Sequence, residues 1–414
     1  GTSSFYGFTN ITSLKIPDKV TSIGSGAFSN CKSLKTINIP DAIKRIEAET
    51  FSGCSSLESI IIPDGVTSIG SEAFKNCESL KTIRIPEAVE SIKYQAFYWC
   101  TSLESINLPK QLTVISSDLF YGCYNLKSIF IPENVTSIGS RAFGKCSSLE
   151  SINIPVKVES IGEYAFISCS SLSTLIINGI GPMIDSTYVS LFSTLSSLIS
   201  NIIIDNGVTS IGPYSFNSFS KLESVNISNT VTSIGESAFS RCNLLESVNI
   251  PDSVTMIGIY AFHLCFCIHS IKIPKGTEFI GEKTFYDCIS LSSITLPDSI
   301  TTIDESAFYN CSSLSSVTLS DGVKSIGEYA FYCCSALTSI NIPDSVTTFG
   351  KFSFFNCSSL SSTIIPNSVT EIAYYMFTNC HSLTSISIPD KLTMIDSYAF
   401  CRCYSLQSVV FPDT

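Results

Sequence analysis

The cysteines of this chain recur at a fixed interval. Of the 18 cysteines in the 414-residue sequence, seven from Cys31 to Cys169 lie 23 residues apart, and the series resumes with eight more from Cys242 to Cys403. A fixed period of this size indicates a repeat architecture, in which each unit packs only on its neighbours. The period therefore predicts a stack of repeats rather than the two or three globular domains that length alone suggests.

Other residue types keep the same phase as the cysteines. A unit reads roughly LxSIxIPxxVTSIGxxAFxxCxxL, and the positions from Pro17 to Pro412 delimit seventeen repeats. Sixteen repeats have 23 residues, and one irregular repeat at 178–204 has 27. A single unit cannot bury its own apolar face, whereas stacking closes a shared core. We therefore expect one repeat solenoid over residues 1–414.

Each unit contains two β-prone runs and one run with helical periodicity. The segment SINIP, residues 339–343, alternates polar and apolar side chains, as a half-buried strand does, and its proline ends the run. VTSI is a second short β-prone run. Ala330, Phe331, Cys334 and Leu337 then follow an apolar helical stripe. The prediction is an α/β-type solenoid, right-handed and curved, with a parallel sheet on the concave face and short β runs and short helices elsewhere.

The irregular repeat is four residues longer than the others, which corresponds to about one helical turn. Val189, Phe192 and Leu195 take the places of Phe, Cys and Leu in this repeat, and further apolar residues prolong the stripe. We therefore expect a longer helix and a local bend over residues 185–200.

Charge and hydropathy exclude several classes of partner. The net charge of −11 and the isoelectric point near 4.8 argue against nucleic acid and anionic membrane surfaces, both of which attract basic patches. No apolar run reaches the roughly 18 residues of a membrane helix. The first residues, GTSSFYGFTN, do not resemble a signal peptide, and the last, FPDT, stop in mid-repeat. We expect a piece of a longer protein, so a missing targeting segment excludes nothing.

The adjacent Cys333 and Cys334 raise the question of a metal, redox or nucleophilic site. Cys334 belongs to the regular ladder on the inward stripe, which predicts a small buried hydrophobe. Disulfide pairing along the ladder is the alternative, disfavoured because the Cβ vectors of stacked repeats run parallel. Cys333 and Cys401 lie off the ladder, and we expect them to be half-exposed spare thiols.

One segment, HLCFCIH at residues 263–269, is zinc-like in residue type. The four His and Cys residues occupy every second position, so they would span about 20 Å in an extended chain. Cys265 also belongs to the ladder. We therefore predict no metal site. The third histidine, His381, lies in a distant repeat. No Gly-rich phosphate loop, HExxH motif or nucleophile elbow is present. We expect no catalytic residue, no cofactor and no enzymatic activity.

The first strand of each repeat presents two outward columns. One is nearly all Ser or Thr, and the other varies from repeat to repeat. We predict ligand contacts on the concave face at Arg84, Asn107, Phe130, Asn153 and Lys272, because an exposed aromatic beside arginine is typical of interaction hot spots. A solvated β-face with scattered apolar residues is the alternative.

A second candidate surface is aromatic and surrounds the Ala-Phe block. It includes Tyr94, Tyr98, Trp99, Tyr329 and Tyr332. Tyr and Trp supply rigid contact area at interfaces. The alternative is that these rings shield the edges between repeats.

The recurring IPDSVTSIGESAF, followed by CxxL and VxIP, resembles the BspA-like, Treponema-type leucine-rich repeats of bacterial and protist surface proteins over nearly the whole chain. It departs from the commonest leucine-rich pattern, which has Asn or Cys three residues beyond the last Leu of the strand. The resemblance implies a curved solenoid at the cell surface or secreted, with adhesion to host or extracellular-matrix proteins. It transfers no ligand-contacting residue. An intracellular protein–protein interaction scaffold built on the same repeat is the alternative.

Overall fold

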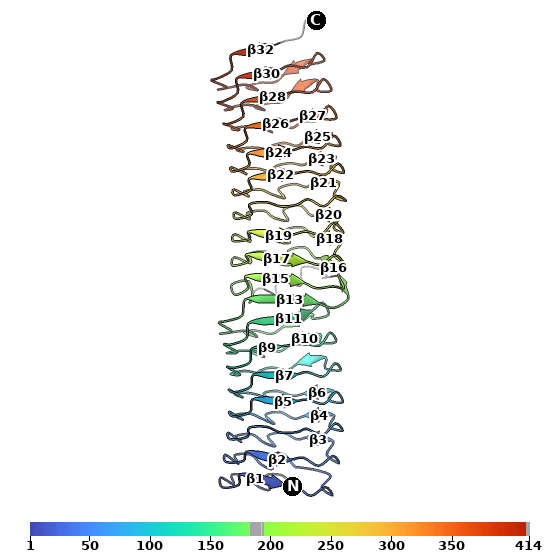
Figure 1. Ribbon diagram of the computed structural model, residues 1–414, viewed down its shortest axis with the longest axis vertical. Coiled ribbons are helices and arrows are strands. Elements are labelled where there is room, and N and C mark those ends of the chain that lie inside the picture. Colours follow the sequence, from blue (N-terminus) through green and yellow to red (C-terminus); the bar gives the residue numbers. More distant parts are fainter. Residues whose placement is uncertain (183–191, 193, 411–414) are drawn as a thin grey trace. The chain divides into compact units, whose positions relative to one another are not determined.

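The computed structural model describes residues 1–182, 192 and 194–410. Within them, short strands stack one above another in parallel (Figure 1), as the prediction of stacked repeats requires. The chain divides into two compact units, of which unit 1 comprises residues 1–179 and 193–199 and unit 2 comprises residues 180–192 and 200–414. The parallel repeat stack is confirmed for each unit, whereas one solenoid over the whole chain stays a prediction.

Most repeats of unit 1 contribute a first strand, at or shortly before the proline position, and a second strand, in the VTSI run; at the first-strand position of residues 59–61, Ile61 makes only isolated β-bridges. The first strands are β1 (Ser13–Lys15), β2 (Thr36–Asn38), β5 (Thr82–Arg84), β7 (Ser105–Asn107), β9 (Ser128–Ile129), β11 (Ser151–Pro155) and β13 (Thr174–Asn178). The second strands are β3 (Arg45–Ile46), β4 (Ser68–Ile69), β6 (Ser91–Ile92), β8 (Val114–Ile115), β10 (Ser137–Ile138) and β12 (Ser160–Ile161). Both predicted β runs are therefore confirmed.

Unit 2 repeats the same arrangement. Its first strands are β15 (Asn201–Ile204), β17 (Ser224–Ile227), β19 (Ser247–Asn249), β22 (Ser293–Thr295), β24 (Ser316–Thr318), β26 (Ser339–Asn341), β28 (Ser362–Ile364), β30 (Ser385–Ser387) and β32 (Ser408–Val410). Its second strands are β14 (Gly181–Pro182), β16 (Val208–Ile211), β18 (Ser233–Ile234), β20 (Met256–Ile257), β21 (Phe279–Ile280), β23 (Thr302–Ile303), β25 (Ser325–Ile326), β27 (Thr348–Phe349), β29 (Glu371–Ile372) and β31 (Met394–Ile395).

The strand register follows the sequence period. Ser13 of β1 pairs with Thr36 of β2, one 23-residue repeat further along the chain. Within unit 2 the pairing of β14 with β16 differs, because Gly181 pairs with Val208 and the register shifts at Pro182. The four extra residues of the irregular repeat therefore enter between Gly181 and Val208.

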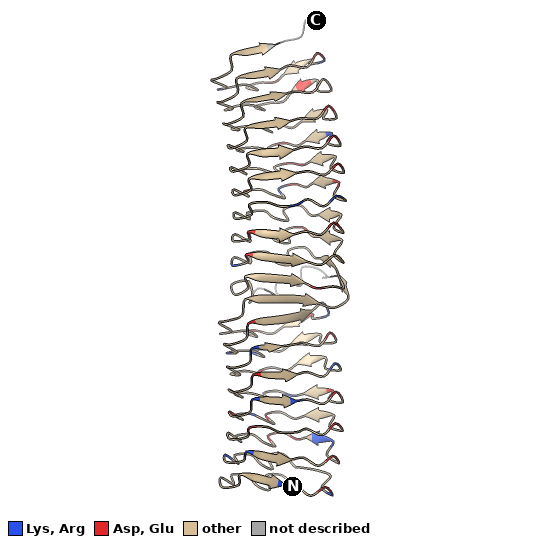
Figure 2. Ribbon diagram, in the orientation of Figure 1, with Lys and Arg blue, Asp and Glu red and all other residues tan. Residues whose placement is uncertain are grey.

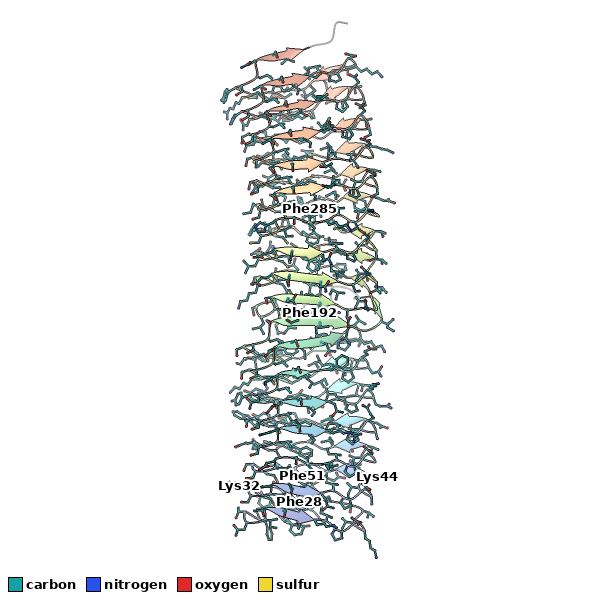
Figure 3. All side chains as sticks on the ribbon, in the orientation of Figure 1. Phe28, Lys32, Lys44, Phe51, Phe192 and Phe285 are labelled. Carbon is teal, nitrogen blue, oxygen red and sulfur yellow. The ribbon has the colours of Figure 1, made fainter. Side chains whose placement is uncertain are left out.

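The columns that the repeat pattern assigns to the core are buried in both units. Phe28 and Phe51 stack with ring centroids 5.6 Å apart and lie one above the other in Figure 3. In unit 2, Phe285 and Phe308 stack at 5.4 Å in the same way. Each buried Phe removes a large apolar surface from water, which stabilises the stack by about 1.5–3 kcal/mol per ring before the entropy of ordering is subtracted.

The predicted short helices are wrong. None of residues 1–182 and 194–410 is helical, and the Ala-Phe block forms successive tight turns instead. In each full repeat of these ranges two residues, four apart, have positive φ, as Gln95 (55°) and Trp99 (57°) do. A left-handed residue interrupts an α-helix, which needs φ near −63° at every position. We call the surface formed by residues 93–100 and their equivalents the turn face.

The hydrogen bonds of the turn face explain the missing helix. The N–H groups of Gln95, Phe97 and Trp99 donate to carbonyls of the next repeat. The intervening N–H groups of Ala96 and Tyr98 donate to carbonyls three residues earlier in their own repeat. An α-helix would direct every N–H to the residue four before it. The apolar stripe therefore belongs to a series of turns in which every second backbone N–H group donates to the next repeat.

The longer helix and bend predicted over residues 185–200 fall mainly on residues 183–191 and 193, which lie outside the described residues. Residues 194–198, which are described, form turns. Within the described ranges, no helix is long and apolar enough to cross a membrane.

Candidate functional site

The strand face is the surface formed by the outward side chains of the first strands. Arg84, Asn107, Phe130 and Asn153 hold the same position in four consecutive repeats of unit 1, so the parallel register brings them together. Lys272 holds the equivalent position in unit 2. Charged residues gather mainly in the turns, and most strands carry none (Figure 2).

Two of the predicted contact residues bind the backbone of their own protein. Asn107 Nδ2 donates to Ile85 O (2.9 Å), while Asn107 Oδ1 accepts from Ile85 N (3.1 Å). Asn153 makes the same pair of bonds with Ile131, at 2.8 and 2.7 Å. Each isoleucine precedes a proline, where the ladder ends and backbone groups need other partners. These amides therefore connect adjacent repeats, and their predicted role in ligand binding stays a prediction.

The two predicted cations on the strand face already have partners. Arg84 Nη1 lies 2.7 Å from Asp64 Oδ1, and Lys272 Nζ lies 2.6 Å from Asp252 Oδ1. The hydrogen bond from Lys272 lowers the pKa of Asp252. In both pairs the aspartate directly follows the proline of the preceding repeat. Both pairs are well exposed, so solvent screens them and a ligand carboxylate can compete for the cation.

Phe130 follows β9 and is the strand-face aromatic of unit 1. Its side chain is 61 % exposed, and among the described residues it stacks on no other ring. It borders a groove of about 480 Å³, which we call the Phe130 groove; the groove is lined by Glu87, Leu108, Lys110, Phe130, Pro132, Glu133 and Asn134. An exposed ring beside a groove is apolar surface that a partner can remove from water.

The turn-face rings of unit 1 are enclosed by their neighbours. Tyr98 stacks on Tyr121 with centroids 5.2 Å apart, and Lys75 Nζ lies 5.5 Å from the Tyr98 centroid. Lys145 Nζ lies 5.6 Å from the centroids of both Trp99 and Tyr121. Cations therefore lie against this cluster at both ends. Tyr94, also predicted as a contact, is 44 % exposed.

Two of these rings pack against glycines of the next repeat. A Cβ added to Gly122 would lie 3.0 Å from Trp99 Cδ2, and one added to Gly144 would lie 2.6 Å from Tyr121 Cδ2. The rings of Trp99 and Tyr121 therefore rest against the backbone of the next repeat, and any side chain at these glycines would displace them.

The turn-face rings of unit 2 form a longer stack. Tyr286, Tyr309, Tyr332 and Phe355 stack at 4.4, 4.6 and 4.8 Å, with interplanar angles of 5° or less. Tyr329 begins a parallel column by stacking on Phe352 at 4.9 Å.

Burial raises the pKa of Tyr309 and Tyr332 in this stack and of Tyr329 in the parallel column. Because the ring faces cover one another, the stack leaves little ring face free for a partner. This packing supports the interpretation that the turn-face rings shield the edges between repeats.

The cysteine ladder is a core element. Cys54 Sγ donates to Phe28 O (3.1 Å) and Cys334 Sγ to Phe308 O (3.2 Å), and the same bond recurs along the ladder. The described cysteines are free thiols, and burial raises the pKa of Cys54 to about 12. Buried thiols with raised pKa values are poor nucleophiles. The predicted burial of Cys334 is confirmed, and Cys333 is half-buried at a left-handed position.

The HLCFCIH segment has a structural explanation. Cys265 is buried and donates to Phe239 O (3.1 Å), and His263 packs edge-on against Tyr260 with centroids 5.5 Å apart. Burial lowers the pKa of His263. Among the described residues no three His, Cys, Asp or Glu side chains gather closely enough to hold a metal ion.

Sequence reasoning missed the walls of the Phe130 groove. Glu87, Lys110 and Glu133 each follow the proline position of consecutive repeats, so a constant register stacks them in one column. Aligning the residue after the proline in these three repeats would have shown a column of alternating negative, positive and negative side chains beside Phe130.

Comparison with family models supports the assignment made from these repeats. The model of the BspA type leucine rich repeat region matches residues 1–124, 67–195, 186–315 and 301–414. The chain belongs to this family. BspA-type repeats generally build non-enzymatic binding scaffolds. Comparison with curated proteins finds no match.

Solved structures of bacterial leucine-rich repeat proteins are similar to this BspA-type chain. One from Bacteroides ovatus ATCC 8483 is 32% identical over 100% of this chain and 87% of its own, with a TM-score of 0.38. A leucine rich cell surface protein from Faecalibacterium prausnitzii A2-165 is 26% identical over 91% and 87%, with a TM-score of 0.38. A leucine-rich repeat protein from Eubacterium ventriosum ATCC 27560 is 21% identical over 83% and 88%, with a TM-score of 0.39.

Proposed function

We propose that this chain is a non-enzymatic adhesion module, displayed at the cell surface or secreted, that binds host or extracellular-matrix proteins through its strand face. The observation that carries the proposal is Phe130, a ring 61 % exposed beside a groove. Most large rings of the repeat stack on a neighbouring ring or lie in the core, whereas Phe130 stacks on no ring among the described residues and borders a groove. Hot spots of protein interfaces are enriched in such exposed aromatic side chains.

The neighbouring side chains also fit a protein interface. Arg84 lies two repeats before Phe130 in the same column, in an exposed ion pair that a ligand carboxylate can replace. A largely polar strand face with an exposed aromatic has the composition of a non-obligate interface, in which a few residues supply most of the affinity. The family membership supports a binding role, and the resemblance to BspA-like surface proteins supports the proposed location.

A binding assay with matched variants tests this proposal. The chain is presented to immobilised extracellular-matrix proteins and to intact host cells, alongside Phe130→Ala and Ile364→Ala. Ile364 is an equally exposed strand-face residue of unit 2, at 67 %. We expect Phe130→Ala to weaken binding by at least about tenfold and Ile364→Ala to leave it unchanged. Loss in neither variant would remove the strand-face assignment, and equal loss in both would overturn the assignment of binding to Phe130.

The intracellular scaffold remains a second candidate, because the free thiols of the ladder are compatible with a reducing compartment. Localisation of the full-length product by cell fractionation and surface labelling separates the two. Recovery solely inside the cell would support the scaffold and contradict adhesion.

A further inference from the structure

We propose that the Phe130 groove binds an extended peptide segment of a partner protein, in which an apolar side chain is flanked by lysine or arginine. This inference rests on the proposed protein-binding function and adds the chemistry of the segment that the groove takes. It is carried by the apolar floor of the groove and by the unpaired charges on its rim.

The floor suits one large apolar side chain. Leu108 and Pro132 line the groove together with Phe130, and Leu108 is only 7 % exposed, so the floor is fixed by the core beneath it. A volume of about 480 Å³ accommodates an aromatic or long aliphatic side chain together with adjoining backbone. An apolar side chain from the partner would cover the face of Phe130 that is now in water.

The rim favours cations on either side of that side chain. Glu87 and Glu133 line the groove, with Lys110 between them, so the rim carries one net negative charge. None of the three makes an ion pair with a described residue. Glu87 does accept a hydrogen bond from the backbone N–H of Lys110 (3.2 Å). Its second oxygen and the whole Glu133 carboxylate remain for a partner.

The surroundings reinforce this preference. Arg84, the cation in the same strand-face column, is already neutralised by Asp64. The chain as a whole carries a net charge of −11, which attracts basic segments over long range. An acidic segment would instead meet two unpaired carboxylates, and the like-charge repulsion selects against it.

Unit 2 offers a built-in contrast. A strand-face groove of about 610 Å³ surrounds Ile364, and the lining residues of this groove, from Ser339 to Ser387, include no charged side chain. It has an exposed apolar side chain but no carboxylate. The proposed chemistry is therefore specific to the Phe130 groove, and Ile364 supplies the matched control.

The test measures binding of two labelled pentapeptides by fluorescence anisotropy at low and physiological salt. One has a central tryptophan flanked by lysines, and the other has glutamates in place of the lysines. We expect the lysine peptide to bind at least about tenfold more tightly at low salt. Phe130→Ala should weaken its binding by at least about tenfold, and Ile364→Ala should not change it.

The rim is tested by charge removal. Glu87→Gln with Glu133→Gln should weaken lysine-peptide binding about five- to tenfold and reduce its salt dependence, whereas Lys110→Gln should strengthen binding. Glu371→Gln, on β29 of unit 2 and not among the groove's lining residues, serves as the charge control and should have no effect. All of these side chains are exposed, so circular dichroism should show unchanged folding in each variant.

Two results would overturn the inference: equal binding of both peptides, or lysine-peptide binding that survives Phe130→Ala. If a matrix protein binds in a Phe130-dependent way while the lysine peptide does not bind, the basic-segment chemistry is wrong and the proposed function stands. If the lysine peptide binds as described while no matrix protein or host cell does, the groove chemistry stands and adhesion is wrong.

Discussion

The turn face and the strand face use aromatic side chains in opposite ways. On the turn face, rings of adjacent repeats cover one another, as Tyr309 and Tyr332 do at 4.6 Å. On the strand face, Phe130 is 61 % exposed beside a groove. When an aromatic residue occupies the same position in consecutive repeats, each ring stacks on the ring of the next repeat. Repetition therefore buries the ring faces. A ring that interrupts a column of other residue types is left for an external partner.

Titration of the cysteine ladder should have the largest effect on stability. Burial raises the pKa of Cys54 and Cys100 to about 12, from about 9 in the unfolded chain. A raised folded-state pKa gives stability that is fully present below the unfolded value and is lost as pH rises toward the folded value. Between pH 9 and 12 each such thiol should cost up to about 1.4 kcal/mol per pH unit.

Urea denaturation at pH 8.0, 9.5 and 10.5 measures this loss. A free energy of unfolding that stays constant up to pH 10.5 would mean that the ladder thiols are not buried in solution.

Removing a core ring should have the next largest effect. Phe120→Ala deletes a fully buried ring of the Phe ladder and should destabilise unit 1 by about 3–5 kcal/mol. Phe130→Ala in the same unit should change the free energy of unfolding by less than about 0.5 kcal/mol. Chemical denaturation of the two variants makes the comparison. A similar loss for both would show that Phe130 is a packing residue.

A turn-face ring should have an intermediate effect. Tyr309→Ala removes two stacking contacts, to Tyr286 and Tyr332, from a half-buried column and should destabilise unit 2 by about 1–2 kcal/mol. Ligand affinity should not change, because these ring faces are occupied. Thermal denaturation and the matrix-binding assay check the two parts. Lost affinity in a folded variant would assign binding to the turn face.

The amide bonds of the strand face should have the smallest effect. Asn107→Ala removes both hydrogen bonds to Ile85 and should cost about 1 kcal/mol. Asn107→Asp keeps the acceptor and loses the donor, so it should retain part of the stability. Denaturation of both variants measures this order. If Asn107→Ala abolishes binding without destabilising, the amide contacts the ligand rather than the backbone.

Much of the fold could be predicted because the residue type at each position of the repeat recurs many times along the chain. The Phe, Cys and Leu columns, both β runs and the parallel stacking follow from the 23-residue period. The helix prediction failed because an apolar stripe arises equally from turns that expose every other N–H to a neighbour. A signal was present in the sequence: Asn precedes the ladder cysteine at Asn30, Asn76, Asn310, Asn356 and Asn379. Asn is the non-glycine residue that most readily adopts positive φ.

The candidate site was harder to predict than the fold. The position of Phe130 followed from strand alternation, whereas the backbone bonds of Asn153 depend on how far a side chain reaches into the preceding repeat. A varying position suggests freedom from packing, yet Asn at that position has a local structural role. The sequence indicates which strand positions lie off the core, but the structure shows that Phe130 at such a position is 61 % exposed and Asn153 only 4 %.

Because the register is constant at 23 residues, one whole repeat is the unit by which the protein can be lengthened or shortened. Duplicating or deleting one whole repeat would leave every Phe, Cys and strand pair with an equivalent neighbour, so such alleles should fold. A change in any other number of residues must be absorbed locally, as the shifted pairing at Gly181 and Pro182 does for four. Recombination between repeats can therefore change the number of repeats in such a protein while the Phe and Cys columns of its core stay the same.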